Sequence, residues 1–129
     1  MNVSTPKIVG KDQAVTVEFD WGQLTWFVNG QLAPGTDMTL GRCILKPGRE
    51  NPRHYHPNCT EILSVIQGTI EHTISEEGGM KKLTVGDSIS IPRNFVHQAR
   101  NLGEEEAILM IVFSSADRET CGEDLHVRL

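Results

Sequence analysis

The chain has 129 residues, of which 38% are apolar and 22% are charged, and its formal net charge is −5 at pH 7. This length fits a single domain whose core can be stable without disulfides or a structural metal. The negative charge, with no cluster of Lys and Arg to offset it, argues against nucleic acid or an anionic membrane as the main partner.

Two further features bear on the cellular compartment. The first residues, MNVSTPKIVGKDQ, lack the apolar segment of a signal peptide, and no apolar run is long enough to cross a bilayer. The three cysteines, Cys43, Cys59 and Cys121, are odd in number, far apart and without CxxC spacing. Such usage is typical of a reducing compartment, so we expect a cytoplasmic protein.

Short apolar runs separated by Gly, Pro, Asn and Asp make up most of the chain, and no long helical periodicity occurs. Each run has the length and composition of a β-strand. The expected strands are AVTVEF (14–19), LTWFVN (24–29), TLGRCIL (39–45), EILSVIQ (61–67), TIEHTI (69–74), KKLTV (81–85), SISIP (88–92) and AILMIVF (107–113). Many short strands in one domain predict an all-β sandwich or closed barrel.

The segment RHYHPNCTE places two histidines and a carboxylate just before an apolar strand. Alternate residues of a strand face the same side, so His54 and His56 project together. Glu61 has the opposite parity, but the turn signal Pro57-Asn58 resets the register and lets it face back. Two imidazoles and a carboxylate are a known ligand set for first-row divalent metals. An HxH tripeptide alone is more often part of a solvated loop, so this interpretation depends on a further ligand.

That further ligand lies in GDSISIPRNFVHQARN, residues 86–101. Pro92 ends a short strand, because proline cannot donate to a central ladder. His97 is then expected to begin another strand, facing the same way as Ala99 and Asn101. A third imidazole from a separate hairpin would complete a site of three histidines and one carboxylate.

Together the two segments resemble the sequence motifs of the cupin superfamily. The first motif, G-x5-H-x-H-x4-E-x6-G, is met at every fixed position, by Gly48, His54, His56, Glu61 and Gly68. The second, G-x5-P-x-G-x2-H-x3-N, is met by Gly86, Pro92, His97 and Asn101. Asn94 stands where the family has glycine, and asparagine also tolerates left-handed backbone.

The resemblance implies an all-β double-stranded β-helix, or jelly-roll barrel, as one cupin domain over residues 1–129. We expect the barrel core at about 36–114, N-terminal strands within 13–30 packing on it, and a polar tail at 115–129 that is loosely held or forms a short helix. Small cupins of this kind commonly form homodimers. The N-terminal strands, which carry Trp21 and Trp26, either supply such an interface or cap the barrel.

The resemblance also implies that His54, His56, Glu61 and His97 bind one divalent transition metal per chain. Iron, manganese, nickel and zinc all suit this ligand set, and the sequence does not choose among them. Gln98 and Asn101 are expected to fix the orientation of the imidazoles, with Asn101 the stronger candidate because it occupies a motif position.

Several other residues have a structural and a functional interpretation. His72 is either a hydrogen-bonded core residue or an acid/base group lining the pocket. Cys59 is expected to act as a small apolar filler. Arg53 and Arg100 are candidates for attracting an anionic substrate to the pocket mouth.

Four protein ligands leave open positions on a metal, which is typical of a catalytic site. The leading interpretation is a metal-dependent enzyme acting on a small polar or enolisable molecule, with a dioxygenase-like oxidoreductase ahead of an isomerase. A non-enzymatic metal- or ligand-binding module, a sensor or store, is the alternative. A metal-free sugar-nucleotide epimerase is disfavoured by the intact ligand set.

Overall fold

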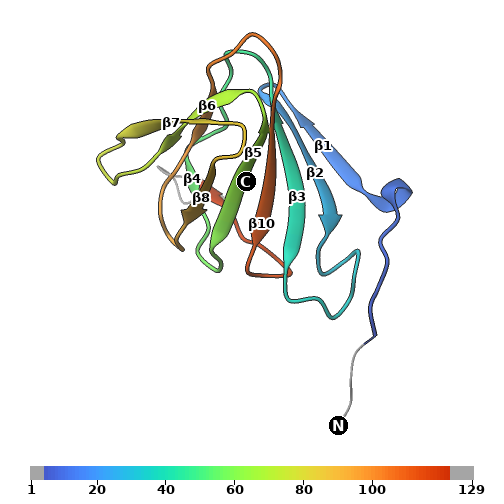
Figure 1. Cartoon of the computed structure of the whole chain (residues 1–129). Coiled ribbons are helices and arrows are strands. Elements are labelled where there is room, and N and C mark those ends of the chain that lie inside the picture. Colours follow the sequence, from blue (N-terminus) through green and yellow to red (C-terminus); the bar gives the residue numbers. More distant parts are fainter. Residues whose placement is uncertain (1–4, 123–129) are drawn as a thin grey trace.

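The structure is a computed structural model that describes residues 5–122 (Figure 1). Its regular secondary structure consists almost entirely of strands. They are β1 Val15–Phe19, β2 Gly22–Val28, β3 Thr39–Leu45, β4 His54–Tyr55, β5 Glu61–Gln67, β6 Thr69–Thr73, β7 Met80–Thr84, β8 Ser88–Ile91, β9 Ala99–Asn101, β10 Ala107–Phe113 and β11 Cys121–Gly122. A 3₁₀ turn, η1, covers Lys11–Gln13. No helix within the described residues is long and apolar enough to cross a membrane.

The strands form a jelly roll. The larger sheet has the order β1-β2-β3-β10-β5-β8. Its strands follow one another in this order from the right of Figure 1 to the left. A smaller sheet, β7-β6-β9, and the pair β11-β4 complete the fold. All of these pairings are antiparallel.

The core follows from alternation along the central strands. In β3 and β10 every second side chain is buried, because successive residues of a strand face opposite sides of the sheet. The buried faces, including Leu45 and Leu109, pack with residues of β5 and β6 such as Val65 and Ile70. The eight strands expected from the apolar runs are confirmed, with ends shifted by no more than two residues.

The N-terminal strands were expected to pack on the barrel, and the structure shows how they attach. β2 pairs antiparallel with β3, with one register shift between Trp26 and Val28, so β1 and β2 extend the larger sheet at its edge. Gly41 of β3 makes this close approach possible, because a Cβ there would lie 2.5 Å from ring atoms of Trp26. The Trp26 ring therefore lies against β3, where it can form part of an internal wall.

The expectation of a loose or helical C-terminal tail is wrong for residues 115–122. Thr39 Oγ1 donates to the main-chain oxygen of Ser115, and Gly30 N donates to that of Ala116. Further along, β11 pairs with β4. The segment is polar in sequence, yet main-chain hydrogen bonds fix it across the fold. Residues 123–129 of the expected tail lie outside the described residues.

Candidate metal centre

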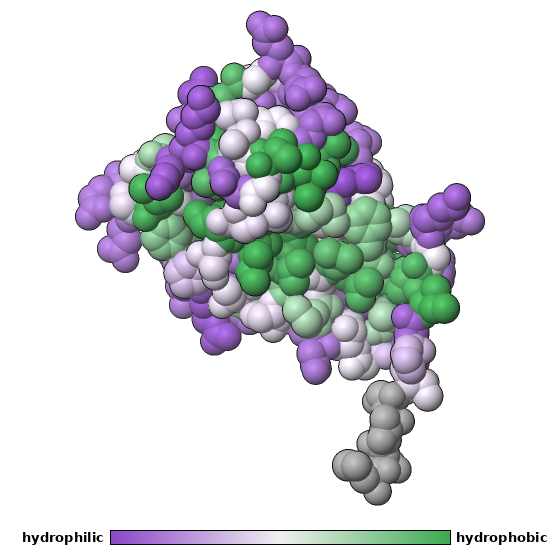
Figure 2. Space-filling model, viewed as in Figure 1, coloured by the Kyte–Doolittle hydropathy of each residue, from purple (hydrophilic) through white to green (hydrophobic). Residues whose placement is uncertain are grey.

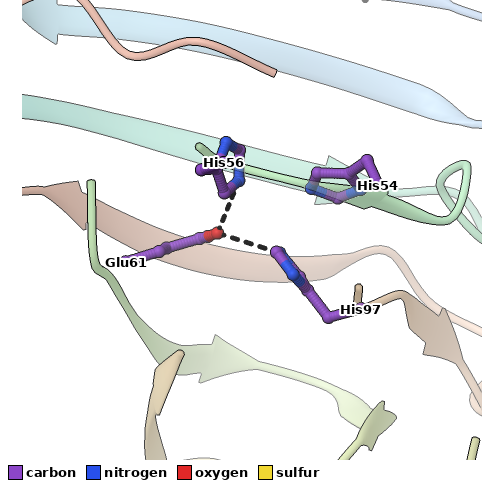
Figure 3. Close-up of side chains that lie close together, drawn as sticks. All are labelled: His54, His56, Glu61 and His97. Carbon is purple, nitrogen blue, oxygen red and sulfur yellow. Dashed lines mark hydrogen bonds and ion pairs between the residues drawn. The ribbon is translucent and has the colours of Figure 1, made fainter. Parts of the chain in front are cut away.

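Four side chains point toward one another: His54, His56, Glu61 and His97 (Figure 3). One ligand atom from each lies within 4.8 Å of the others. His54 begins β4, His56 follows that strand, Glu61 begins β5 and His97 precedes β9. Glu61, His56 and His97 are buried, and His54 is half-buried. The structure thus brings together all four residues that the sequence proposes as ligands.

Main-chain hydrogen bonds between the two motif segments set this convergence. His54 N donates to His97 O at 3.1 Å, and His97 N donates to His54 O at 2.8 Å. Asn94 N donates to the oxygen of His56, and Asn94 itself has φ 69°. The prediction that asparagine can take the left-handed backbone in place of glycine is therefore confirmed.

The Nδ1 atom of each candidate ligand histidine faces a main-chain oxygen. His54 Nδ1 lies 2.7 Å from Pro52 O, His56 Nδ1 lies 2.9 Å from Glu119 O, and His97 Nδ1 lies 2.8 Å from Phe95 O. A carbonyl oxygen only accepts, so Nδ1 must carry the proton and donate. In the neutral ring, Nε2 then keeps its lone pair, which is the form that binds a metal.

Glu61 ties the cluster together electrostatically. Its Oε1 lies 3.1 Å from Nε2 of His56 and 3.1 Å from Nε2 of His97, as the dashed lines of Figure 3 show. Burial alone would raise the pKa of Glu61, but the close contacts of its carboxylate with His56 and His97 outweigh burial and hold the pKa well below its usual range. Burial, together with repulsion from His97 and His56, lowers the pKa of His54 to about 3.

These contacts show that the donor set fits a metal cation. With Nδ1 already donating, a neutral imidazole would present its Nε2 lone pair to a carboxylate oxygen at 3.1 Å, which is repulsive. A cation bound between these atoms would turn this repulsion into attraction. Three imidazole nitrogens and one carboxylate oxygen are ligands that first-row divalent metals accept.

Gln98 and Asn101 do not orient the imidazoles, so this expectation is wrong. Asn101 is buried, and its amide donates to the main-chain oxygens of Leu45 and Glu105 while its oxygen accepts from Gly103 N. Gln98 donates to Asn51 O. Asn101 therefore ties the end of β9 to β3 and to the turn before β10. The imidazoles are oriented by main-chain oxygens instead.

His72 lies beside the cluster without belonging to it. Its ring is nearly parallel to that of His97, with centroids 5.5 Å apart, and it is fully buried. Nδ1 lies 2.8 Å from Thr73 O, whereas no described group hydrogen-bonds its Nε2. Burial chiefly lowers the pKa of His72, which favours the neutral ring. Cys59 packs in the apolar core, and burial raises the pKa of its thiol.

The C-terminal segment supplies site residues that sequence reasoning missed. Besides the Glu119 oxygen, Thr120 Oγ1 lies 3.2 Å from His56 Nδ1. The guanidinium of Arg118 lies over the ring of Trp26, 4.2 Å from its centroid, and 5.4 Å from that of Phe113. This segment has three consecutive charged residues between small ones, a pattern with no strand or helix period that would have pointed to it.

A cavity of about 530 Å³ adjoins the cluster. Its walls are mainly apolar and come from β1, β2, β3, β5 and β10, with Trp26 and Phe113 among them, and from Trp21 in the turn between β1 and β2. His72, Arg118 and Thr120 also line it, whereas Arg53 and Arg100 do not. The four candidate ligands therefore face a space that a small molecule can enter.

Comparisons with known proteins agree with this architecture. Residues 41–113, more than half of the chain, match the family model described as the cupin domain. Germin-like protein 1-1 of Oryza sativa subsp. japonica is 33% identical over 93 residues, covering 67% of this chain and 43% of that protein. Oxalate oxidase 1 of Hordeum vulgare is 34% identical over 91 residues, covering 64% of this chain and 45% of that protein.

A solved structure of recombinant oxalate oxidase in complex with glycolate superposes with a TM-score of 0.71 and 26% identity. The match covers 80% of this chain and 55% of that one. The chain thus spans about half the length of these relatives.

Proposed function

The chain belongs to the cupin family, and from that premise we propose that it is a metal-dependent enzyme acting on a small molecule with oxygen donors, an oxidoreductase ahead of an isomerase. The observation that carries this proposal is the set of three imidazole nitrogens and one carboxylate oxygen, all within 4.8 Å of one another, at the wall of a cavity. A purely structural metal site would be closed off from such a space.

His54, His56, Glu61 and His97 would hold one divalent metal per chain, with iron, manganese, nickel and zinc as candidates. A bound metal would supply Lewis acidity toward a substrate oxygen and, if it is redox-active, electron transfer. The chain's own residues bind and orient. Main-chain oxygens hold each imidazole in one tautomer, and the apolar walls exclude water around the bound molecule.

The oxidoreductase preference is supported by two comparisons, since both the barley relative and the glycolate complex are named as oxalate oxidase. Because the chain spans about half of those proteins, their activity comes to it only as a proposal. An isomerase needs the same metal but no oxidant, so oxygen consumption separates the two.

The experiment begins with metal analysis of tag-free protein, followed by oxygen uptake with the iron- and manganese-loaded forms against a panel of hydroxy acids, diketones and catechols. We expect one metal per chain and substrate-dependent oxygen uptake that Glu61→Gln abolishes. Stoichiometric metal without turnover on any substrate, and without isomerisation, would support a sensor or storage module instead. A chain that binds no metal would overturn the proposal.

We also propose a homodimer formed through the N-terminal hairpin. The side chains of Val15, Val17 and Phe19 share one face of β1 and are 48%, 42% and 39% exposed. Figure 2 shows apolar surface extending across the molecule toward the N-terminal part of the chain. Sedimentation of Val15→Lys should show a monomer, whereas Glu18→Lys, on the opposite face of the same strand, should leave the dimer intact. A wild-type monomer would overturn this proposal.

The three cysteines are free thiols in the structure. They support the proposal that the protein works in a reducing, cytoplasmic environment. Fractionation of cells producing the full chain would test it, and recovery outside the cytoplasm would contradict it.

A further inference from the structure

The cavity beside the candidate metal centre is larger and more apolar than a very small polar substrate needs. Its volume is about 530 Å³, within the range of about 300–1,000 Å³ typical of pockets for drug-sized ligands. One side consists of aromatic and aliphatic groups: Phe19, Trp21, Trp26, Leu109, Ile111 and Phe113. Oxalate, which has no apolar part, would leave these walls in contact with water.

The aromatic part of this wall is ordered by its own contacts. Phe19 and Trp21 stack with ring centroids 4.7 Å apart. Trp26 and Phe113 meet at 6.0 Å, and Phe113 in turn lies 5.0 Å from the ring of His56. The wall therefore leads from the hairpin at the edge of the sheet to the candidate ligands, and a planar ring can lie along it.

Arg118 provides a positive charge at the junction of wall and cluster. It stacks on Trp26 and Phe113, and its Nη1 donates to Thr120 Oγ1. None of the ion pairs that Glu61 and Arg100 form within residues 5–122 includes Arg118. Glu61 acts on the Arg118 charge only at longer range than an ion pair, so this half-buried guanidinium can bind an anionic group of a ligand.

We propose that the cavity binds an amphipathic organic anion. Its carboxylate would lie between Arg118 and the candidate metal centre, and its aromatic ring against the wall of Trp21, Trp26 and Phe113. The inference rests on the proposed function only for what happens to this molecule after binding. It narrows the substrate from a small polar molecule to a ring-bearing acid, and it assigns Arg118 the role of carboxylate recognition.

Binding can be measured without turnover, because both tryptophans of the chain line the cavity and their fluorescence reports its occupancy. The probes are 3-phenylpropionate, its neutral counterpart 3-phenylpropan-1-ol, acetate and oxalate. Titrations use the full chain, both metal-free and loaded with zinc, which has no redox chemistry. Calorimetry on the same samples confirms the dissociation constants.

We expect 3-phenylpropionate to bind about 10- to 100-fold more tightly than acetate, because the wall buries its ring. Arg118→Gln should lower the affinity for 3-phenylpropionate by about 10- to 100-fold, because charge-assisted hydrogen bonds are lost, and leave the affinity for the alcohol nearly unchanged. Arg118→Lys keeps the charge but loses the planar guanidinium. Its affinity for 3-phenylpropionate should lie between those of the wild type and Arg118→Gln. Arg100→Gln, an exposed arginine outside the cavity, is the matched control and should change neither ligand.

Three results would overturn the inference: no binding of 3-phenylpropionate, binding of oxalate or acetate at least as tight, or equal weakening of acid and alcohol by Arg118→Gln. Thermal unfolding of both Arg118 variants checks that the fold is intact, and Arg118→Lys alone carries the test if the glutamine variant does not fold. The proposed function fails in a different way. In that case the protein binds no metal or turns over no substrate, but it still binds the ring-bearing acid more tightly than acetate.

Discussion

The imidazole Nδ1 of His56 lies 2.9 Å from the main-chain oxygen of Glu119, a residue 63 positions further along the chain. This contact joins the first motif to the segment that ends the described structure. Asn58 fixes the same segment, because its amide nitrogen donates to Asp117 O and its oxygen accepts from Glu119 N. The orientation of one candidate ligand thus depends on a segment that carries none of the motif residues.

Asn58→Ala should therefore lower metal affinity although Asn58 touches no ligand atom. Without these two hydrogen bonds, residues 117–119 are held less firmly against His56, and we expect a loss of about tenfold in metal affinity, as for other partners of ligating histidines. Competition titration with a chelating dye measures this. Ser114→Ala removes a similar exposed bond, to Thr60 N, and should change affinity little. Equal effects of the two variants would contradict the mechanism.

His56→Ala should reduce metal affinity by more than about a hundredfold while the fold persists, because a ligand is lost and the core is not. Metal content after dialysis and circular dichroism measure the two effects. His72→Asn is the matched control, since this histidine lines the same cavity outside the ligand cluster. Normal occupancy in His56→Ala would refute the ligand assignment.

Asn101→Leu should destabilise the protein by about 2–4 kcal/mol, because the Leu45 and Glu105 oxygens would lose a buried donor. Urea unfolding measures the loss. Metal occupancy at saturating metal should stay normal, since no imidazole contacts Asn101. An altered metal spectrum in a stably folded variant would restore the role that the sequence motif suggested.

The metal-free protein should lose stability as the pH falls below about 6.5. The pKa of His54 is lowered in the folded state from 6.5 to about 3, so the unfolded chain takes up the proton first and acid favours unfolding. Between pH 7 and pH 5 this amounts to about 1–2 kcal/mol. The lowered pKa of Glu61 acts in the same direction at lower pH. Urea unfolding of His54→Gln over this range should show a smaller loss, and an unchanged pH profile would contradict the assignment.

Much of the fold could be predicted because the strands have strong local signals. Short apolar runs such as those of β3 and β10, with turn residues between them, indicate the strands without any long-range information. The convergence of His54, His56, Glu61 and His97 could also be predicted, since motif spacing fixes which hairpin supplies each side chain. The left-handed backbone conformation of Asn94 could be predicted too, because the residue occupies a glycine position of the motif.

The missed features depend on main-chain atoms or on long-range contacts. The partners of the imidazole Nδ1 atoms are carbonyl oxygens, which every residue has, so no residue pattern identifies them. Residues 115–122 have little apolar character, and their order comes from hydrogen bonds to distant loops. Arg118 gains its place in the cavity only through that segment. Asn101 occupies a motif position because it ties strands together. The motif alone does not distinguish this structural role from orienting a ligand.

The use of peptide oxygens to orient the candidate ligands has an evolutionary consequence. A substitution in the cavity replaces a side chain but leaves those oxygens where they are. The orientation of the candidate ligands therefore does not depend on which side chains line the cavity. Trp21, Trp26 and Arg118 can then diverge to admit new molecules while the same coordination chemistry is inherited. For the engineer, this separates two tasks: the binding chamber can be redesigned without rebuilding the centre it serves.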